Sequence, residues 1–143
     1  MMAEKARLFG DAASLEAILN ARKPDEQKRL GRLVKNFDET LWLSNARDIV
    51  YRGNRAKFTT HRDLLQMLFD TEGTTLAEAS PVDTLWGIGL AADALDAQDR
   101  RKWLGKNWLG ETLQRLRDNL LAEHRGAGIP EHVERAARKA RSR

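Results

Sequence analysis

The stretch ETLQRLRDNLLAEH, residues 111–124, carries the clearest structural pattern in the sequence. Its leucines lie at positions 113, 116, 120 and 121, so they share one face of a helix with 3.6 residues per turn. Polar and charged side chains fill most of the positions between them. The pattern predicts an amphipathic helix that buries its leucine face in a core.

The same spacing recurs upstream and predicts a mainly α-helical fold. Asp11 is a candidate cap for a helix over residues 12–21, and Pro24 starts a segment that runs to residue 35. Asp38 opens a longer helix, and Thr60 is expected to cap the next one. Residues 2–9 have a helical composition but no capping residue before them. The predicted apolar face of the long helix consists of Trp42, Ala46, Ile49, Val50 and Gly53.

Composition excludes several classes of protein. A chain of 143 residues amounts to about one domain. Cysteine is absent and the three histidines are widely spaced, so thiol chemistry, disulfides and a histidine-built metal site are not expected. The apolar fraction of 41% contains no run long enough for a membrane span, and no signal peptide is recognised. We expect a cytoplasmic protein that needs no cofactor or metal.

The positive charge is concentrated at the carboxyl end. Residues 126–143 have a net charge of +3 out of the total of +4, which leaves the rest of the chain nearly neutral. The sequence therefore predicts a domain over residues 1–125 followed by a basic tail. A tail of this kind is usually a solvated end, and a contact with nucleic acid is the alternative.

Residues 72–110 form a long segment without sustained periodicity. It holds five glycines, and only residues 74–78 have the composition of a short strand. Loops of this length inside a domain are uncommon and are most often functional. We therefore expect the chemistry of the protein to lie on this segment.

Several residue types in this segment are suited to binding and catalysis. Glycines beside Trp86 allow close approach to a flat ligand, which the indole can stack against. Asn107 offers a donor and an acceptor on one amide. Glu78 and Asp83 are two carboxylates for proton transfer or for stabilising a cation. Each also has a structural interpretation, as a core tryptophan, a turn or a helix cap.

Four motifs together resemble the NADAR family, which includes the YbiA-like N-glycosidases. They are MMAEKA from residue 1, RAKF from residue 55, LxExSPxDxxWGIG from residue 76 and GxNxLGxxLxxxR from residue 105. The resemblance covers roughly residues 1–123. It implies a compact, mainly helical domain with a long loop at its active site. The implied reaction is hydrolysis of the bond between ribose C1 and a base nitrogen.

The resemblance also implies roles for individual residues. Lys5 matches the family lysine that can capture ribose C1 as a Schiff base, with Glu78 and Asp83 as catalytic carboxylates at the pocket. The expected pocket wall is formed by Trp86, Gly87 and Gly89. Asn107 is expected to hold a ribose hydroxyl or a phosphate, and Lys57 a phosphate. The other tryptophans (Trp42, Trp103 and Trp108) are assigned to packing, and Arg117 to support of the loop.

Three functions remain open at this point. In the first, the protein is an N-glycosidase whose substrate is a phosphorylated ribosylaminopyrimidine of riboflavin biosynthesis or a related ADP-ribose compound. In the second, the substrate is ADP-ribosylated guanine in DNA, and the basic tail would follow the DNA phosphates. A shortened member that only binds nucleotide is the third. Family members carry an upstream segment with Ser-Asn-Phe and a glutamate, whereas this chain starts inside the motif. We therefore expect an amino-terminally shortened, weakly active form; the oligomeric state does not follow from the sequence.

Overall fold

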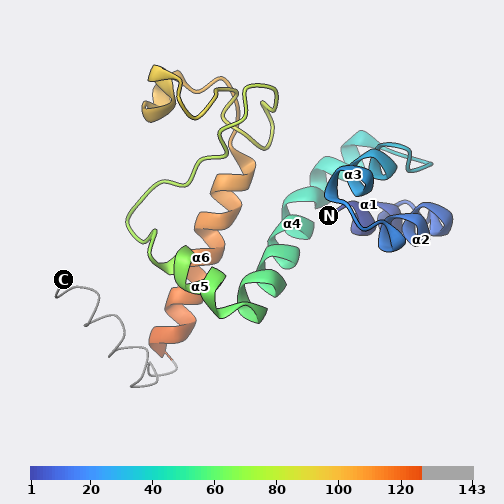
Figure 1. Cartoon of the computed structure of the whole chain (residues 1–143), viewed down its shortest axis with the longest axis horizontal. Coiled ribbons are helices and arrows are strands. Elements are labelled where there is room, and N and C mark those ends of the chain that lie inside the picture. The colour runs from blue at the N-terminus through green and yellow to red at the C-terminus, as the bar shows by residue number, and fades with distance from the viewer. Residues whose placement is uncertain (127–143) are drawn as a thin grey trace. The chain divides into compact units, whose positions relative to one another are not determined.

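The computed structural model describes residues 1–126, and this part of the chain is mainly α-helical, as predicted (Figure 1). It contains six α-helices and two short 3₁₀ helices, and no strand lies within these 126 residues. The chain divides into two compact units, Met1–Lys57 and the part from Phe58 onward, which are described separately below. None of the described helices is long and apolar enough to cross a membrane. The predicted basic tail lies almost entirely outside the described residues.

Four helices start in the first unit. They are α1 (Met2–Leu8), α2 (Ala12–Asn20), α3 (Pro24–Arg32) and α4 (Glu39–Thr60), of which the last continues past the end of the unit. Helices α1, α2 and α3 contact one another pairwise. The predicted apolar face of α4 is confirmed for four of its five members, which are buried, but Gly53 is exposed. The buried stripe thus ends one turn earlier than the spacing predicts, since glycine has no side chain to pack.

Asp11 joins three segments of the first unit. Its Oδ1 accepts a hydrogen bond from the backbone N–H of Ser14 at 3.0 Å, which confirms the predicted cap of α2. Its Oδ2 accepts from the N–H of Lys35 at 2.9 Å, and its own N–H donates to the carbonyl of Ala6. The end of α1, the start of α2 and the loop after α3 therefore meet at one residue, Asp11, the first through its backbone and the other two through its carboxylate. These donated hydrogen bonds, first that from Lys35, lower the pKa of Asp11 to about 2.

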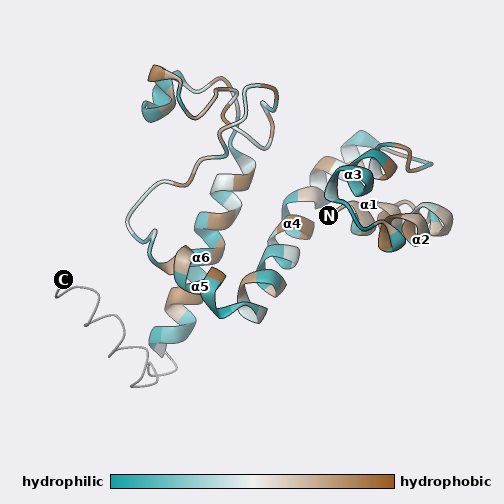
Figure 2. Ribbon diagram, viewed as in Figure 1, coloured by the Kyte–Doolittle hydropathy of each residue, from teal (hydrophilic) through white to brown (hydrophobic). Residues whose placement is uncertain are grey.

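Helices α5 (Arg62–Phe69) and α6 (Trp108–Gly126) contact each other in the second unit. The predicted stripe of α6 is confirmed at Leu116 and Leu120, which are fully buried, and hydrophilic and hydrophobic positions alternate along this helix in Figure 2. The prediction that Thr60 caps α5 is wrong. Thr60 is the last residue of α4, and the extended backbone of His61 separates the two helices.

The long segment between these helices connects α5 to the amino-terminal end of α6 (Figure 1). It contains only the 3₁₀ helices η1 (Leu95–Gln98) and η2 (Arg100–Lys102). The strand predicted over residues 74–78 does not form. Side-chain amides take the place of a neighbouring strand: Leu76 N–H donates to Gln114 Oε1, Leu76 C=O accepts from Asn107 Nδ2, and Glu78 N–H donates to Asn107 Oδ1.

Arg117 supports the start of this segment from α6, as predicted. Its side chain is buried, and its Nη1 donates to the carbonyls of Thr71 and Thr74 at 2.7 and 3.0 Å. Its Nε also donates to the carboxylate of Asp118 at 2.9 Å. A buried guanidinium needs such partners, because burial of an unpaired charge is costly. The residues after α5 are thereby tied to the middle of α6.

We expect Asp11→Ala to lower the melting temperature of the protein by several degrees, because it removes a helix cap and the bond to the loop after α3. A lowered pKa stabilises the fold above the ordinary value of 3.8, and this stabilisation is lost as the pH falls toward 2. Between these two values the wild type should therefore lose more of its melting temperature than Asp11→Ala does. Melting followed by circular dichroism at a series of pH values measures both effects. Equal acid sensitivity of the two proteins would contradict this account.

Candidate active site

Asp83 forms the turn that carries Trp86. Its Oδ1 accepts hydrogen bonds from the backbone N–H groups of Leu85 and Trp86, at 3.0 and 2.7 Å. A carboxylate that accepts from the chain two or three residues ahead fixes a tight turn. Asp83 is half-buried. One carboxylate oxygen of this predicted catalytic residue therefore holds the loop in shape.

The turn lies against residues 104–109. The carbonyls of Thr84, Trp86 and Gly87 accept backbone hydrogen bonds from this second segment, and both Leu104 and Gly105 donate to the carbonyl of Ile88. These bonds join the third and fourth sequence motifs, although fifteen residues separate them. The two motifs thus form one structural element.

Close packing explains the glycines of the predicted pocket wall. A Cβ on Gly87 would lie 2.7 Å from the carbonyl oxygen of Asp83 and 2.9 Å from that of Glu78, so no side chain fits there. Gly89 has a φ of +73°, a conformation that favours glycine. Both residues are buried. The structure brings the predicted wall residues together, while their contact with a substrate stays a prediction.

Trp86 packs against Trp108 at the start of α6. Their ring centroids lie 5.7 Å apart with the planes at 90°, which is the edge-to-face arrangement that aromatic pairs prefer. Trp86 remains half-buried. One part of its indole therefore attaches the turn to α6, and the stacking of a base on the ring stays a prediction.

The Asn107 side chain connects the end of the long loop to residues 76–78 near its beginning. Its side chain bonds both Leu76 and Glu78, as described above, and it is buried to 2% exposure. Its φ of +54° is a left-handed conformation that asparagine tolerates better than most residues. The sequence motif predicts contact of Asn107 with a ribose hydroxyl or a phosphate and does not reveal this structural role.

Glu78 contributes its backbone to this arrangement and has an exposed side chain. Its N–H donates to Asn107, and its carbonyl accepts from Ile88 at 2.9 Å. The backbone is thus held on both sides, which fixes where the carboxylate starts. Its catalytic role stays a prediction.

Lys5 lies in the first unit, on α1. Its Nζ donates to the carbonyl of Gly31 at 2.9 Å and lies 4.1 Å from the ring centroid of Phe37 and 5.7 Å from that of Trp42. Burial lowers the pKa of this amine from its ordinary value of 10.5. A lowered pKa is what a lysine nucleophile requires near neutral pH.

Two aromatic rings lie beside the Lys5 amine, and the helical spacing of apolar residues marks only one of them. Trp42 is buried, which confirms its assignment to packing, and it also contacts the amine. Phe37 was missed, because it lies in the irregular stretch between α3 and α4, where no periodicity marks it. Its ring is 46% exposed and packs edge-on against Phe9.

Lys57, the predicted phosphate ligand, is an exposed residue of α4 that also has interactions of its own. It and Lys5 belong to the first unit, whereas the predicted carboxylates, the wall residues and Asn107 belong to the second. Within residues 1–126 there is no cluster of three side chains suited to holding a metal ion.

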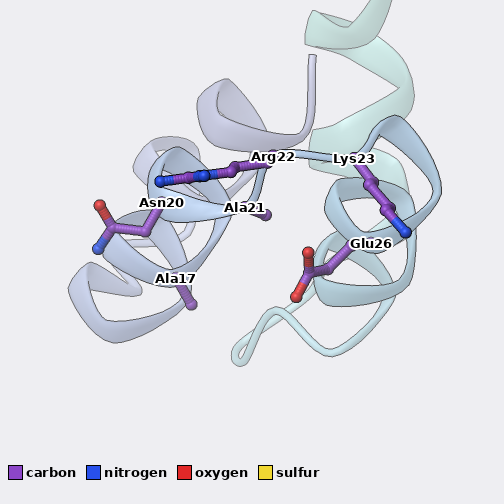
Figure 3. A pocket seen from close by; sticks show the side chains of 6 residues that line it. All are labelled: Ala17, Asn20, Ala21, Arg22, Lys23 and Glu26. Atoms are coloured by element: carbon purple, nitrogen blue, oxygen red, sulfur yellow. The ribbon is translucent and has the colours of Figure 1, made fainter.

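A surface pocket of about 520 Å³ lies elsewhere in the first unit, where α2 ends and α3 begins (Figure 3). Its lining residues are Ala17, Asn20, Ala21, Arg22, Lys23 and Glu26. None of them belongs to the four sequence motifs. The opposite charges of Glu26 and its two basic neighbours give the pocket no clear preference for an anion or a cation.

The structure thus defines a mainly helical protein with a glycine-rich, side-chain-braced loop and a half-buried lysine. Comparison with known proteins gives the family: the NADAR domain matches residues 1–121, and the chain belongs to the NADAR family. A relative from Acanthamoeba polyphaga mimivirus, "N-glycosidase R617", is 45% identical over 118 residues, which are 82% of this chain and 69% of the relative.

Two further relatives extend the comparison. "Protein irg-1" of Caenorhabditis elegans is 41% identical over 121 residues, which are 83% of this chain and 57% of the relative. The maize "Riboflavin biosynthesis protein PYRR, chloroplastic" is 38% identical over 111 residues, which are 75% of this chain but 16% of the relative. This chain therefore corresponds to only part of each of these proteins.

We expect Asn107→Gly to lower the free energy of unfolding by ~1–3 kcal/mol, because it leaves backbone groups of Leu76 and Glu78 without their buried partner. Asn107→Ala should cost ~1 kcal/mol more, since alanine does not tolerate the positive φ that glycine accepts. Urea unfolding followed by tryptophan fluorescence gives both values. The glycine variant is the matched control that separates hydrogen bonding from backbone strain, and wild-type stability in both variants would contradict the bridging role.

Proposed function

We propose that this protein is an N-glycosidase that hydrolyses the bond between ribose C1 and a base nitrogen. The observation that carries the proposal is the Lys5 amine, which matches the family motif and whose pKa is lowered by burial. Two of the relatives described above support it by name, one as an N-glycosidase and one as a riboflavin biosynthesis protein. The favoured substrate is accordingly a phosphorylated ribosylaminopyrimidine.

Lys5 acts as the nucleophile in the proposed reaction. Its neutral amine forms a bond to C1 of the ribose, the bond from C1 to the base nitrogen breaks, and the leaving nitrogen takes up a proton. The lysine nitrogen then loses a proton, the bond from C1 to the ring oxygen breaks as that oxygen takes up a proton, and the sugar opens to an imine between C1 and Lys5. Water adds to C1 of this imine and releases the sugar and the lysine. A neutral amine is needed for the first step, which is why the lowered pKa matters.

The carboxylates supply the remaining chemistry. Positive character develops at C1 and the ring oxygen as the glycosidic bond breaks, and a nearby carboxylate stabilises it. Asp83 is proposed for this role and Glu78 for proton transfer to or from the leaving base. Trp86, Gly87 and Gly89 are proposed to border the base, and Asn107 and Lys57 to contact ribose or phosphate.

A second candidate substrate is ADP-ribosylated guanine in DNA. The observation that favours it is the net charge of +3 on residues 126–143, since basic tails follow nucleic-acid phosphates. A panel that offers a ribosylaminopyrimidine phosphate and ADP-ribosylated DNA side by side separates the two candidates. Turnover of DNA that falls steeply with added salt would favour the second, and turnover of neither would favour a binding protein without catalysis.

Borohydride added during turnover should trap a covalent sugar adduct that maps to Lys5. Lys5→Arg should abolish the adduct and reduce turnover to background, because a guanidinium keeps its charge and is not nucleophilic near neutral pH. Peptide mass spectrometry locates the adduct, and Lys28→Arg on the surface of α3 is the matched control. Wild-type turnover by Lys5→Ala would mean that water attacks C1 directly.

Asp83→Asn should lower kcat by ~10²-fold or more with little change in KM, because it removes the negative charge and keeps the side-chain shape. The Oδ1 of asparagine can still accept from Leu85 and Trp86, so the turn should be preserved. Steady-state kinetics on the preferred substrate measures the effect, and an unchanged melting temperature is the control. An Asp83→Asn protein with wild-type kcat would remove Asp83 from the catalytic residues.

A further inference from the structure

The Lys5 amine has more contacts than its role as a nucleophile alone requires. Three contacts converge on the amine: the carbonyl of Gly31 at 2.9 Å, the ring of Phe37 at 4.1 Å and the ring of Trp42 at 5.7 Å. They come from α3, from the loop that follows it and from α4. The amine is thus held by segments that are distant from α1 in the sequence.

We infer that Phe37 and Trp42 are positioning residues for Lys5, which hold its amine in one orientation and keep water from two of its sides. This inference rests on the role proposed for Lys5 above. The hydrogen bond to Gly31 uses one N–H, and the two rings limit the rotamers of the flexible lysine stem. A nucleophile held in one geometry reacts faster than one that samples many.

The rings act on the amine in two opposite ways. Their faces attract an ammonium ion, which favours the charged form. They also displace water, which favours the neutral form, and burial lowers the pKa of Lys5 from its ordinary value. Glu4, the carboxylate next to Lys5 in the sequence, forms its ion pair with Arg7.

The position of Phe37 is itself built into the fold. The N–H of Lys35 is bound by Asp11, and the ring of Phe37 packs edge-on against Phe9 with the centroids 5.3 Å apart. The loop that carries Phe37 is therefore tied to the end of α1 and the start of α2. With 46% of its surface exposed, Phe37 lies at the edge of the core, where its ring contacts both Phe9 and the Lys5 amine.

The experiment measures how fast the Lys5 amine reacts with carbonyl probes. Ribose 5-phosphate is added with cyanoborohydride: the amine adds to the open-chain aldehyde, water leaves, and hydride reduces the imine to a secondary amine. Formaldehyde with the same reductant serves as a second probe that needs no binding pocket. Mass spectrometry gives the rate at Lys5 relative to exposed Lys28 in the same molecule.

We expect Phe37→Leu to slow labelling of Lys5 by both probes several-fold relative to Lys28, because leucine keeps apolar bulk but lacks the ring. Phe37→Tyr should restore the wild-type ratio. In turnover of the preferred substrate, Phe37→Leu should lower kcat more than it changes KM. Leu33→Ala, at an exposed apolar position just after α3, is the matched control and should leave the ratio unchanged.

Other results would overturn the inference. A higher labelling rate in Phe37→Leu would show that the rings favour the ammonium form, and an unchanged rate in both Phe37→Leu and folded Trp42→Leu would show that they do not act on the amine. Slower labelling by ribose 5-phosphate alone would assign the rings to sugar binding instead. If Lys5→Arg kept full turnover while Phe37→Leu still slowed labelling, the proposed role of Lys5 as the nucleophile would fail and the positioning of its amine by the rings would stand.

Discussion

The need of irregular backbone for hydrogen-bond partners governs both units of this protein. Segments outside helices and sheets carry N–H and C=O groups that must find partners when they are buried. In the second unit, Asn107 and Gln114 serve residues 76–78, Asp83 serves its own turn, and Arg117 serves the start of the loop. These polar side chains make a strandless loop a defined structure on which the predicted pocket wall is built.

The first unit uses the same device on a smaller scale. Asp11 binds the start of α2 and the loop after α3, and that loop places Phe37 beside the Lys5 amine. The helix cap Asp11 thus contributes indirectly, through the loop that carries Phe37, to the environment of the proposed nucleophile. In both units, a residue with a proposed catalytic role depends for its position on a polar side chain that bonds the backbone of two segments.

The family and the structure support different parts of the functional argument. Membership in the NADAR family and the viral relative's name support hydrolysis of an N-glycosidic bond as the proposed reaction, and the maize relative is named as a riboflavin biosynthesis protein. The structure adds physical reasons for particular residues: a half-buried amine with a lowered pKa at Lys5, and a carboxylate at Asp83 whose backbone bonds leave its second oxygen for other partners. It also shows that several residues of the motifs, Gly87 and Asn107 among them, meet demands of packing.

The sequence by itself determined the helices, because apolar spacing and caps are local properties: α2 with its Asp11 cap, α4 and α6 lie close to their predicted positions. It also determined the family, through four motifs in order. Only the tertiary structure decided that residues 76–78 pair with side-chain amides and form no strand, and that Phe37 lies against Lys5. Those contacts join residues about thirty positions apart, and no periodicity in a single sequence records which distant side chain will satisfy a backbone group or bury an amine.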